Sequence, residues 1–393
     1  MCPRSPGCGF ASSTMAQIVA YLRDTVFHKD QWNPPNTDWD AAFKQYPDRQ
    51  FAFLSDLLSA VWFTIGFSVF RVFFDRFVSG PIGMRLMGIR RADMFPPTSE
   101  VQPTPKLRKA FADNIRPSSA VLDRLAQEHN TTRAAISTWF KQQRGVKRSE
   151  IKVSKFTESS WRLTYYVCAI VMGVLTLKDK PWFTDPSKCF SDEFPYQHIS
   201  QDVKIYYLVS LGFYGHLIIF QFFEEAKKDF WEMFVHHVST IALISLSWSL
   251  NYVRIGTLVL LVHDIADPWL EFAKLMHYSK LDKICDIGFV GFAVTFGISR
   301  LYVYPLYVIR ATIVDGLVAA GNRKIIVWWL FNALLILLLV LHIYWYYLVL
   351  RMVYKFVVVG MVEKDERSAT DVSELEEQQE RLGKKGEKKK KQN

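Results

Sequence analysis

The sequence predicts an all-α protein that crosses a membrane several times. Half of the 393 residues are hydrophobic and 30 are phenylalanine, although polar ends and a polar middle dilute the mean hydropathy. Long local apolar runs therefore decide the class, because a helix needs about 20 mostly apolar residues to cross the hydrocarbon core. We expect about seven transmembrane helices, at residues 51–74, 161–177, 206–225, 233–250, 255–272, 285–306 and 326–350.

Basic residues set the expected orientation. The segment after the first apolar run is rich in Arg and Lys, whereas the stretch before it is charge-balanced. Because cytosolic connections carry the excess of basic residues, we expect residues 1–50 in the lumen and residues 75–150 in the cytosol. Seven spans then place the C-terminus in the cytosol. No signal peptide is expected, since the first long apolar run starts far from the N-terminus, and Met15 is an alternative start.

Ionisable side chains inside two consecutive apolar runs mark the expected functional site. His236 and His237 open the fourth run. The fifth run contains His263, Asp264 and Asp267. Such groups cost about a few kcal/mol each inside a bilayer, so they normally face a site or a partner. In the expected orientation both sets lie in one layer near the cytosol, with His236 roughly 6 Å and Asp267 roughly 8 Å deep.

Two further polar residues lie inside the expected spans. His342, in the seventh, falls at a similar depth and could join the layer of His and Asp side chains. Arg300 lies toward the luminal end of the sixth span. There we expect it either to extend to the interface or to pack with Asn332.

A histidine beside a carboxylate suggests general-base catalysis near neutral pH. We favour His236 over His237, because Ser239 and Thr240 extend the polar face of His236 along the helix. His236 could also be a nucleophile that forms an acyl-imidazole, but that species hydrolyses unless water is well excluded, so we favour the base. Two readings compete with catalysis. Two His and two Asp could bind a metal, or they could be satisfied polar groups that lock helices together. The cysteines show no metal-ligand spacing, and no metal is expected.

The ionisable residues lie in three stretches of sequence: Lys228-Asp229-Phe230-Trp231-Glu232-Met233-Phe234-Val235-His236-His237, Asn251-Tyr252-Val253-Arg254-Ile255-Gly256-Thr257 and His263-Asp264-Ile265-Ala266-Asp267. These stretches closely resemble the signature region of ceramide synthases. The resemblance extends over the TLC domain, about residues 156–360. It includes Phe194-Pro195-Tyr196-Gln197, Ser299-Arg300-Leu301 and the pattern Asn332…His342…Trp345.

The resemblance implies an N-acyltransferase of the endoplasmic reticulum membrane. Such an enzyme joins the acyl group of a fatty acyl-CoA to the amine of a sphingoid base (sphinganine or sphingosine) and gives dihydroceramide or ceramide, with acyl-CoA as a substrate and no cofactor. The family's catalytic roles fall on His236, His237, Asp264 and Asp267. Lys227 and Lys228 are candidates to bind the CoA phosphates, although positive-inside anchoring explains them equally well. Membrane lipids are further expected partners, and a homo- or hetero-dimer with related synthases is left open.

Two other classes of function compete with the enzyme. A non-enzymatic TLC-type protein that binds lipid or assists translocation needs no buried His and Asp, so their intact pattern disfavours it. A membrane-tethered transcription regulator rests only on the cytosolic segment. The sequence does not give the preferred acyl chain length. In the family that the chain resembles, the connection between the last two spans, here about residues 309–324, influences that preference.

The cytosolic segment 75–150 contains a helix–turn–helix pattern, with helices expected at 118–128 and 131–140. Its stretch Trp139-Phe140-Lys141-Gln142-Gln143-Arg144 resembles the recognition helix of a homeodomain, so we name residues 75–150 the Hox-like segment. The adenine-reading Asn of a homeodomain corresponds to Gln142, which disfavours DNA binding. A basic surface that meets anionic lipid head groups or CoA phosphates is favoured instead.

The C-terminal tail, residues 361–393, is charged and lacks apolar periodicity, so we expect it to be disordered. Ser368 and Ser373 each precede an acidic residue by three positions, a pattern that acidophilic kinases accept. Lys390 and Lys391 resemble a dilysine retrieval signal for the endoplasmic reticulum.

Overall fold

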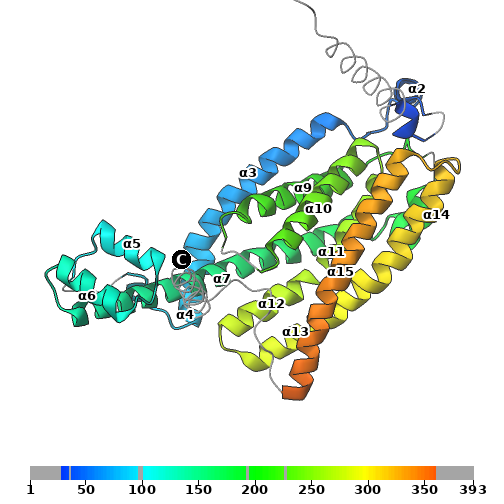
Figure 1. Cartoon of the computed structure of the whole chain (residues 1–393). Helices are drawn as coiled ribbons and strands as arrows, with labels where there is room; N and C mark the ends of the chain where they lie inside the picture. The colour runs from blue at the N-terminus through cyan, green and yellow to red at the C-terminus, as the bar shows by residue number, and fades with distance from the viewer. Residues whose placement is uncertain (1–27, 35–36, 96–100, 192–193, 225–227, 360–393) are drawn as a thin grey trace, which may run out of the picture.

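A computed structural model describes residues 28–34, 37–95, 101–191, 194–224 and 228–359, and these ranges contain helices and no strand (Figure 1). The all-α prediction is therefore confirmed. Some predictions concern residues outside these ranges, namely those for the tail and for Lys227, Ser368, Ser373, Lys390 and Lys391.

Five helices in the described residues are long and apolar enough to cross a membrane. They are Leu54–Leu86, Arg133–Leu177, Gln201–Phe220, Asp282–Ala319 and Ile326–Lys355. They confirm a multi-pass membrane protein, and they contain most of the expected first, second, third, sixth and seventh spans. The fourth expected span is the less apolar helix α10 (Phe230–Ser249), and the fifth is divided into α11 (Val253–Asp264) and α12 (Asp267–Tyr278). The count of seven is thus not confirmed, because polar residues lower the hydropathy of α10, and α11 and α12 are only 12 residues long each.

The first span is longer than expected. Helix α3 (Leu57–Phe74) continues through the π-helical turn η4 (Asp75–Ser79) into α4 (Gly80–Leu86), before η5 (Arg91–Met94). The helix therefore continues beyond residue 74, the predicted end of the span, and the charge near this position is neutralised inside the protein. Arg71 is buried, and its Nη2 atom lies 2.8 Å from Oε1 of Glu224, which follows α9 (Gln201–Phe220). Gly212 lets α3 and α9 pack closely against each other, because a Cβ atom at this position would collide with Phe63.

The 45-residue helix α7 (Arg133–Leu177) joins the Hox-like segment to the membrane bundle without a break (Figure 1). Its first turns pack against α5 (Pro105–Asp113) and α6 (Ser119–Glu128) around a core that contains Leu107 and Trp139. Thr132 caps the start of α7, since its hydroxyl accepts a hydrogen bond from the N–H of Ala135. The predicted end near Phe140 is wrong. The Lys, Gln, Arg and Glu residues that follow favour helix and continue it into the membrane span.

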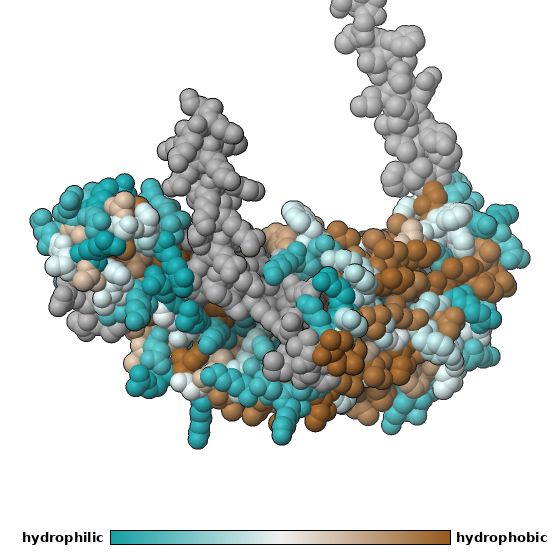
Figure 2. All heavy atoms as spheres, turned by 60° about the horizontal axis from the view of Figure 1, so that its bottom comes forward, coloured by the Kyte–Doolittle hydropathy of each residue, from teal (hydrophilic) through white to brown (hydrophobic). Residues whose placement is uncertain are grey.

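The sixth span is one continuous helical run made of α13 (Asp282–Phe296), the π-helical η7 (Gly297–Ile309) and α14 (Arg310–Ala319). Most of the expected connection at residues 309–324 is therefore helix. Only residues 320–325 separate α14 from α15 (Ile326–Val359). Hydrophobic side chains cover much of the bundle in Figure 2, whereas polar side chains gather over the lobe that α5 and α6 form.

Short elements close the end of the bundle that lies opposite α5 and α6. They are η2 (Lys29–Gln31), α2 (Trp39–Gln45), η3 (Leu54–Asp56), α8 (Pro181–Thr184) and η6 (Pro186–Cys189). Hydrogen bonds tie the loops together: Ile199 N–H donates to the carbonyl of Gln50 at 2.8 Å, and Asn251 Nδ2 donates to the carbonyl of Gln197 at 3.1 Å. These contacts stabilise the end of the bundle opposite α5 and α6. At this end α10 ends, and α11 and α15 begin.

Candidate active site

The chain breaks between α11 and α12 inside the expected polar layer. Helix α11 ends at Asp264, α12 begins at Asp267, and Pro268 stands in the first turn of α12. Proline lacks a backbone donor and restricts the residue before it, which explains the break. The two aspartates consequently do not share one continuous helix face, although a spacing of three residues would place them on one face of an unbroken helix.

The two aspartates have different partners. Asp264 is 1% exposed and accepts a 3.5 Å hydrogen bond from the Tyr214 hydroxyl of α9. Asp267 accepts a 2.7 Å hydrogen bond from Nη2 of Arg300. No hydrogen bond joins either carboxylate to His236 within the described ranges. The pairing expected between His236 and an aspartate is thus replaced, at Asp267, by an ion pair with Arg300.

Arg300 does not lie where the sequence predicted. It is buried, bonded to Asp267 and also to the carbonyl of His263, rather than extended to the luminal interface. Asn332 instead accepts a hydrogen bond from Thr312 at 2.9 Å. Both predictions for Arg300 are wrong because the sixth span is longer than expected, which brings residue 300 close to its middle.

A cavity between α7, α10, α12 and η7 contains most of the predicted site, and we name it the polar cavity. It encloses about 1100 Å³ of space, its open mouth included. The structure brings His236, His237 and Asp267 into its lining and leaves Asp264 outside. Other polar residues in the lining are Lys155, Glu158, Ser159, Arg162, Tyr166, Tyr214, Asp229, His263, Glu271, Lys274, Tyr278 and Arg300.

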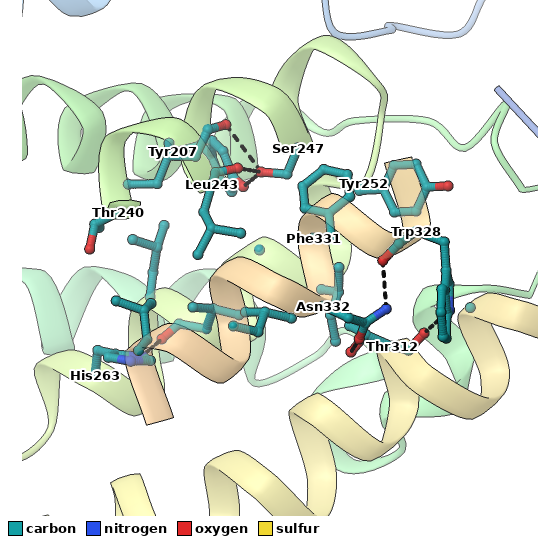
Figure 3. A pocket seen from close by; sticks show the side chains of 18 of the residues that line it. Tyr207, Thr240, Leu243, Ser247, Tyr252, His263, Thr312, Trp328, Phe331 and Asn332 are labelled. Carbon is teal, nitrogen blue, oxygen red and sulfur yellow. Dashed lines mark hydrogen bonds between the residues drawn. The ribbon is translucent and has the colours of Figure 1, made fainter. Parts of the chain in front are cut away.

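A second cavity, the apolar chamber, lies between α10, α11, α14 and α15 (Figure 3). It encloses about 740 Å³ and is lined mainly by Phe190, Leu243, Ile244, Tyr252, Ile255, Val259, Leu260, Phe331, Leu335 and Leu338. Its few polar groups are largely paired with one another, since Thr312 bonds to Asn332 and accepts at its carbonyl from Trp328 Nε1 at 3.2 Å. His263 and Tyr214 line both cavities, so the two spaces meet at these side chains.

The hydrogen bonds of His263 define its tautomer. Nδ1 lies 2.6 Å from the carbonyl of Val259 and must donate to it, since a carbonyl only accepts. Nε2 is then an unprotonated acceptor in the neutral ring, and this buried atom has no hydrogen-bond partner among the described residues. His342 is fully buried with its ring centre 4.8 Å from that of His263, so it lies at the predicted depth but outside the lining of both cavities.

His236 and His237 are held differently. His237 Nδ1 lies 2.9 Å from Oε1 of Gln221, whose Nε2 donates to the carbonyl of Phe230, so the ring is fixed by a short chain of hydrogen bonds. His236 packs edge to face on Trp345 at 5.4 Å between ring centres. Its buried Nδ1 atom has no hydrogen-bond partner in the described part of the chain. Of the two histidines, His236 therefore has a ring nitrogen available for chemistry.

The cavity also contains residues that the sequence reasoning missed. Glu271 and Lys274 follow Asp267 by four and seven positions, a helical spacing that the sequence already showed. Lys155 comes from α7, which no local pattern connects to the site. Lys228 is exposed and absent from the lining of the polar cavity. No group of three or more His, Cys, Asp or Glu side chains within the described ranges is arranged to hold a metal ion.

A polar cavity with histidines and carboxylates that shares two lining side chains with an apolar chamber, inside a helical bundle that crosses a membrane, defines an integral membrane enzyme acting on long-chain lipids. A family profile described as the TLC domain matches residues 155–351. Ceramide synthase 5 of Mus musculus is 33% identical over 365 residues, which cover 92% of this chain and 86% of that protein. The chain belongs to the ceramide synthase family.

Two other relatives agree with that assignment. Ceramide synthase 5 of Homo sapiens is 34% identical over 349 residues, covering 88% of this chain and 86% of that protein. Ceramide synthase 4 of Bos taurus is 34% identical over 357 residues, covering 90% of this chain and 88% of that protein. The similarity thus extends well beyond the residues of the TLC domain.

Proposed function

We propose that the two cavities are the substrate sites of an acyl-CoA-dependent sphingoid base N-acyltransferase. The protein is an enzyme of the ceramide synthase family, and this membership contradicts the non-enzymatic alternative. In our proposal the fatty acyl chain occupies the apolar chamber, and the CoA portion occupies the polar cavity. The observation that carries it is the junction at His263 and Tyr214, which line both cavities.

The reaction then takes place beside the histidines. The substrate amine, in its uncharged form, attacks the thioester carbonyl carbon, so that a C–N bond forms and the C–S bond breaks. His236 accepts the proton that the amine loses and returns it to the sulfur of the departing CoA. The unprotonated Nε2 of His263 is a second acceptor at the junction. His237, which is fixed by Gln221, holds α10 in position.

Arg300 supplies positive charge where the oxyanion of the tetrahedral intermediate develops. Its Nη2 atom is bound to Asp267, whereas its buried Nε has no hydrogen-bond partner within the described chain. Asp267 would accordingly act by fixing the guanidinium. Asp264 would act more remotely, through its hydrogen bond to Tyr214.

The helix α14 supports a role for the chamber in selecting the acyl chain. Thr312 and Gly316 of α14 line the chamber, and both belong to the connection that the family resemblance associates with chain-length preference. A Cβ atom on Gly316 would lie 3.3 Å from the ring of Phe190, so this wall has little spare room. We propose that α14 and Phe190 limit the length of chain that fits.

The remaining assignments concern the mouth of the polar cavity and the membrane. Lys155 and Lys274 line this cavity and are better placed for the CoA phosphates than the exposed Lys228. The basic Hox-like segment supports a cytosolic mouth in the endoplasmic reticulum membrane, with the N-terminus luminal and the C-terminus cytosolic. A basic lipid-facing surface suits this segment better than DNA recognition. Dimer formation stays a prediction.

One experiment tests the proposed function. Membranes that contain the protein are supplied with sphinganine and a series of acyl-CoAs, and the products are identified by mass. We expect dihydroceramides, and we expect none from His236→Ala, while the exposed histidine variant His277→Ala keeps its activity. Acyl-CoA given without sphinganine distinguishes a base from a nucleophile, because only a nucleophile adds one acyl mass to the peptide with His236. A wild-type protein that forms no amide would overturn the proposal.

A further inference from the structure

We propose that Glu271 binds the ammonium group of the incoming sphingoid base, an inference that rests on the function proposed above. Glu271 lies on α12 and is 3% exposed, yet it lines the polar cavity. Its Oε1 atom is bound to Nζ of Lys274 at 3.1 Å. Its Oε2 atom is buried without a hydrogen-bond partner in the described residues, so one carboxylate oxygen is available to a ligand.

The other carboxylates of the cavity are already engaged. Asp267 is bound to Arg300 at 2.7 Å, and Glu158 lies 2.7 Å from Nη1 of Arg162. Asp229 has contacts of its own, although its buried Oδ1 atom also lacks a hydrogen-bond partner among the described residues. Asp229 precedes α10, whereas Glu271 lies on α12 one turn beyond Asp267 and combines burial, access to the cavity and an uncommitted oxygen. Its hydrogen-bond partner among the described residues is weakly held, because Lys274 is a flexible side chain that is 22% exposed.

The position of Glu271 suits an amine that is to react beside His236. Glu271 follows Asp267 by one helical turn, about 6 Å along the axis. Side chains on a helix lean toward its N-terminus, so the Glu271 carboxylate extends back toward Asp267 and the histidines. An ammonium on Oε2 would consequently lie between the cavity mouth and the reactive layer, from which it can lose a proton and attack the thioester.

The chemistry of the two substrates also favours Glu271 as the group that binds the ammonium. A buried carboxylate with an unsatisfied oxygen is costly, and a primary ammonium is a compact charge with three donors that can satisfy it. Acyl-CoA carries no amine of this strength, and its phosphates are repelled by a carboxylate. Glu271 therefore selects the second substrate. As the ammonium binds, Lys274 is released toward the mouth, where CoA phosphates can neutralise it.

The test compares Glu271→Gln with wild type in membranes, by varying each substrate while the other is saturating. Gln keeps the size and removes the charge. We expect the KM for sphinganine to rise about tenfold or more, with kcat within about threefold and the KM for acyl-CoA unchanged. The control is Glu150→Gln, a neutralised glutamate on the exposed face of α7, for which we expect wild-type values. An equal KM for sphinganine in Glu271→Gln and wild type would overturn the proposal.

Two further measurements separate the alternatives. With 1-deoxysphinganine, which lacks the terminal hydroxyl, Glu271→Gln should still raise KM; an effect confined to sphinganine would show that Glu271 binds the hydroxyl and not the ammonium. If Glu271→Gln does not accumulate in membranes, Glu271→Asp replaces it. That variant keeps the charge on a shorter side chain, and an unchanged KM for sphinganine would reject the assignment. A wild-type protein without amide synthesis defeats the proposed function itself, whereas active protein with an indifferent Glu271 defeats this inference alone.

Discussion

The two cavities share His263, but the side chains that line them differ in polarity. The polar cavity collects charged side chains from α7, α12 and η7 and histidines from α10, whereas the apolar chamber is lined by aliphatic and aromatic residues of α10, α11, α14 and α15. Changes in the first should alter the rate of the reaction, because charge and proton transfer take place there. Changes in the second should alter which acyl chain reacts, because shape alone distinguishes chains. The junction makes both properties act on one thioester.

The largest effect is expected at the reactive layer. His236→Ala should lower kcat by roughly 10³-fold or more, since it removes a proton acceptor from a group of residues that acts as a unit. A double variant with Asp267→Ala should be hardly slower than His236→Ala alone, as measured from initial rates in membranes. Effects that multiply would show that the two side chains act independently.

Arg300 should give the next largest effect. Arg300→Gln removes the charge that faces the developing oxyanion, and kcat should fall about 10²–10³-fold while KM for acyl-CoA stays near its wild-type value. Arg300→Lys keeps a charge but cannot bond to Asp267 and to the carbonyl of His263 in the same planar geometry, so it should recover activity only in part. Full activity of Arg300→Gln would show that the guanidinium takes no part in the reaction.

A substitution in the apolar chamber should change which acyl-CoA is preferred and leave the rate of the reaction nearly unaltered. Gly316→Ala places a methyl group 3.3 Å from the Phe190 ring and shortens the space available. We expect the ratio of kcat/KM between the longest and the shorter accepted acyl-CoAs to fall about tenfold, measured by competition within one mixture. Gly66→Ala is the matched control, because a Cβ atom there meets no atom within 4 Å. The same chain preference in both variants would place chain selection elsewhere.

The smallest effect is expected at Lys155 in the lining of the polar cavity. Lys155→Gln should raise the KM for acyl-CoA about threefold to tenfold without changing the KM for sphinganine, since it removes one ionic contact to phosphate. The effect should shrink as ionic strength increases. Lys283→Gln, an exposed lysine at the start of α13, serves for comparison. Equal KM values for acyl-CoA in both variants at low salt would show that Lys155 does not bind the CoA phosphates.

The comparison also shows what the sequence can predict. The polar layer was recognisable because His and Asp are rare in apolar runs, so five positions in two consecutive segments stood out. The apolar chamber has no such signal, since its residues are ordinary core residues contributed by four separate helices. The π-helical part of the sixth span hid the pairing of Arg300 with Asp267, because helix length was underestimated there. The helix break at Pro268 was predictable from the sequence, and it separates Asp264, which is bonded to Tyr214, from the helix of Asp267.

The unbroken helix α7 has a mechanical consequence. Its N-terminal part is clamped by the core around Trp139, and Arg162 farther along lies in the wall of the polar cavity. These two positions are about 35 Å apart along one axis at 1.5 Å per residue. A flexible loop would not transmit a displacement or a rotation applied at one end. A continuous, packed helix transmits both to its other end. Whatever binds the lobe of α5 and α6 therefore also holds one wall of the polar cavity, where we propose that the amide bond is made.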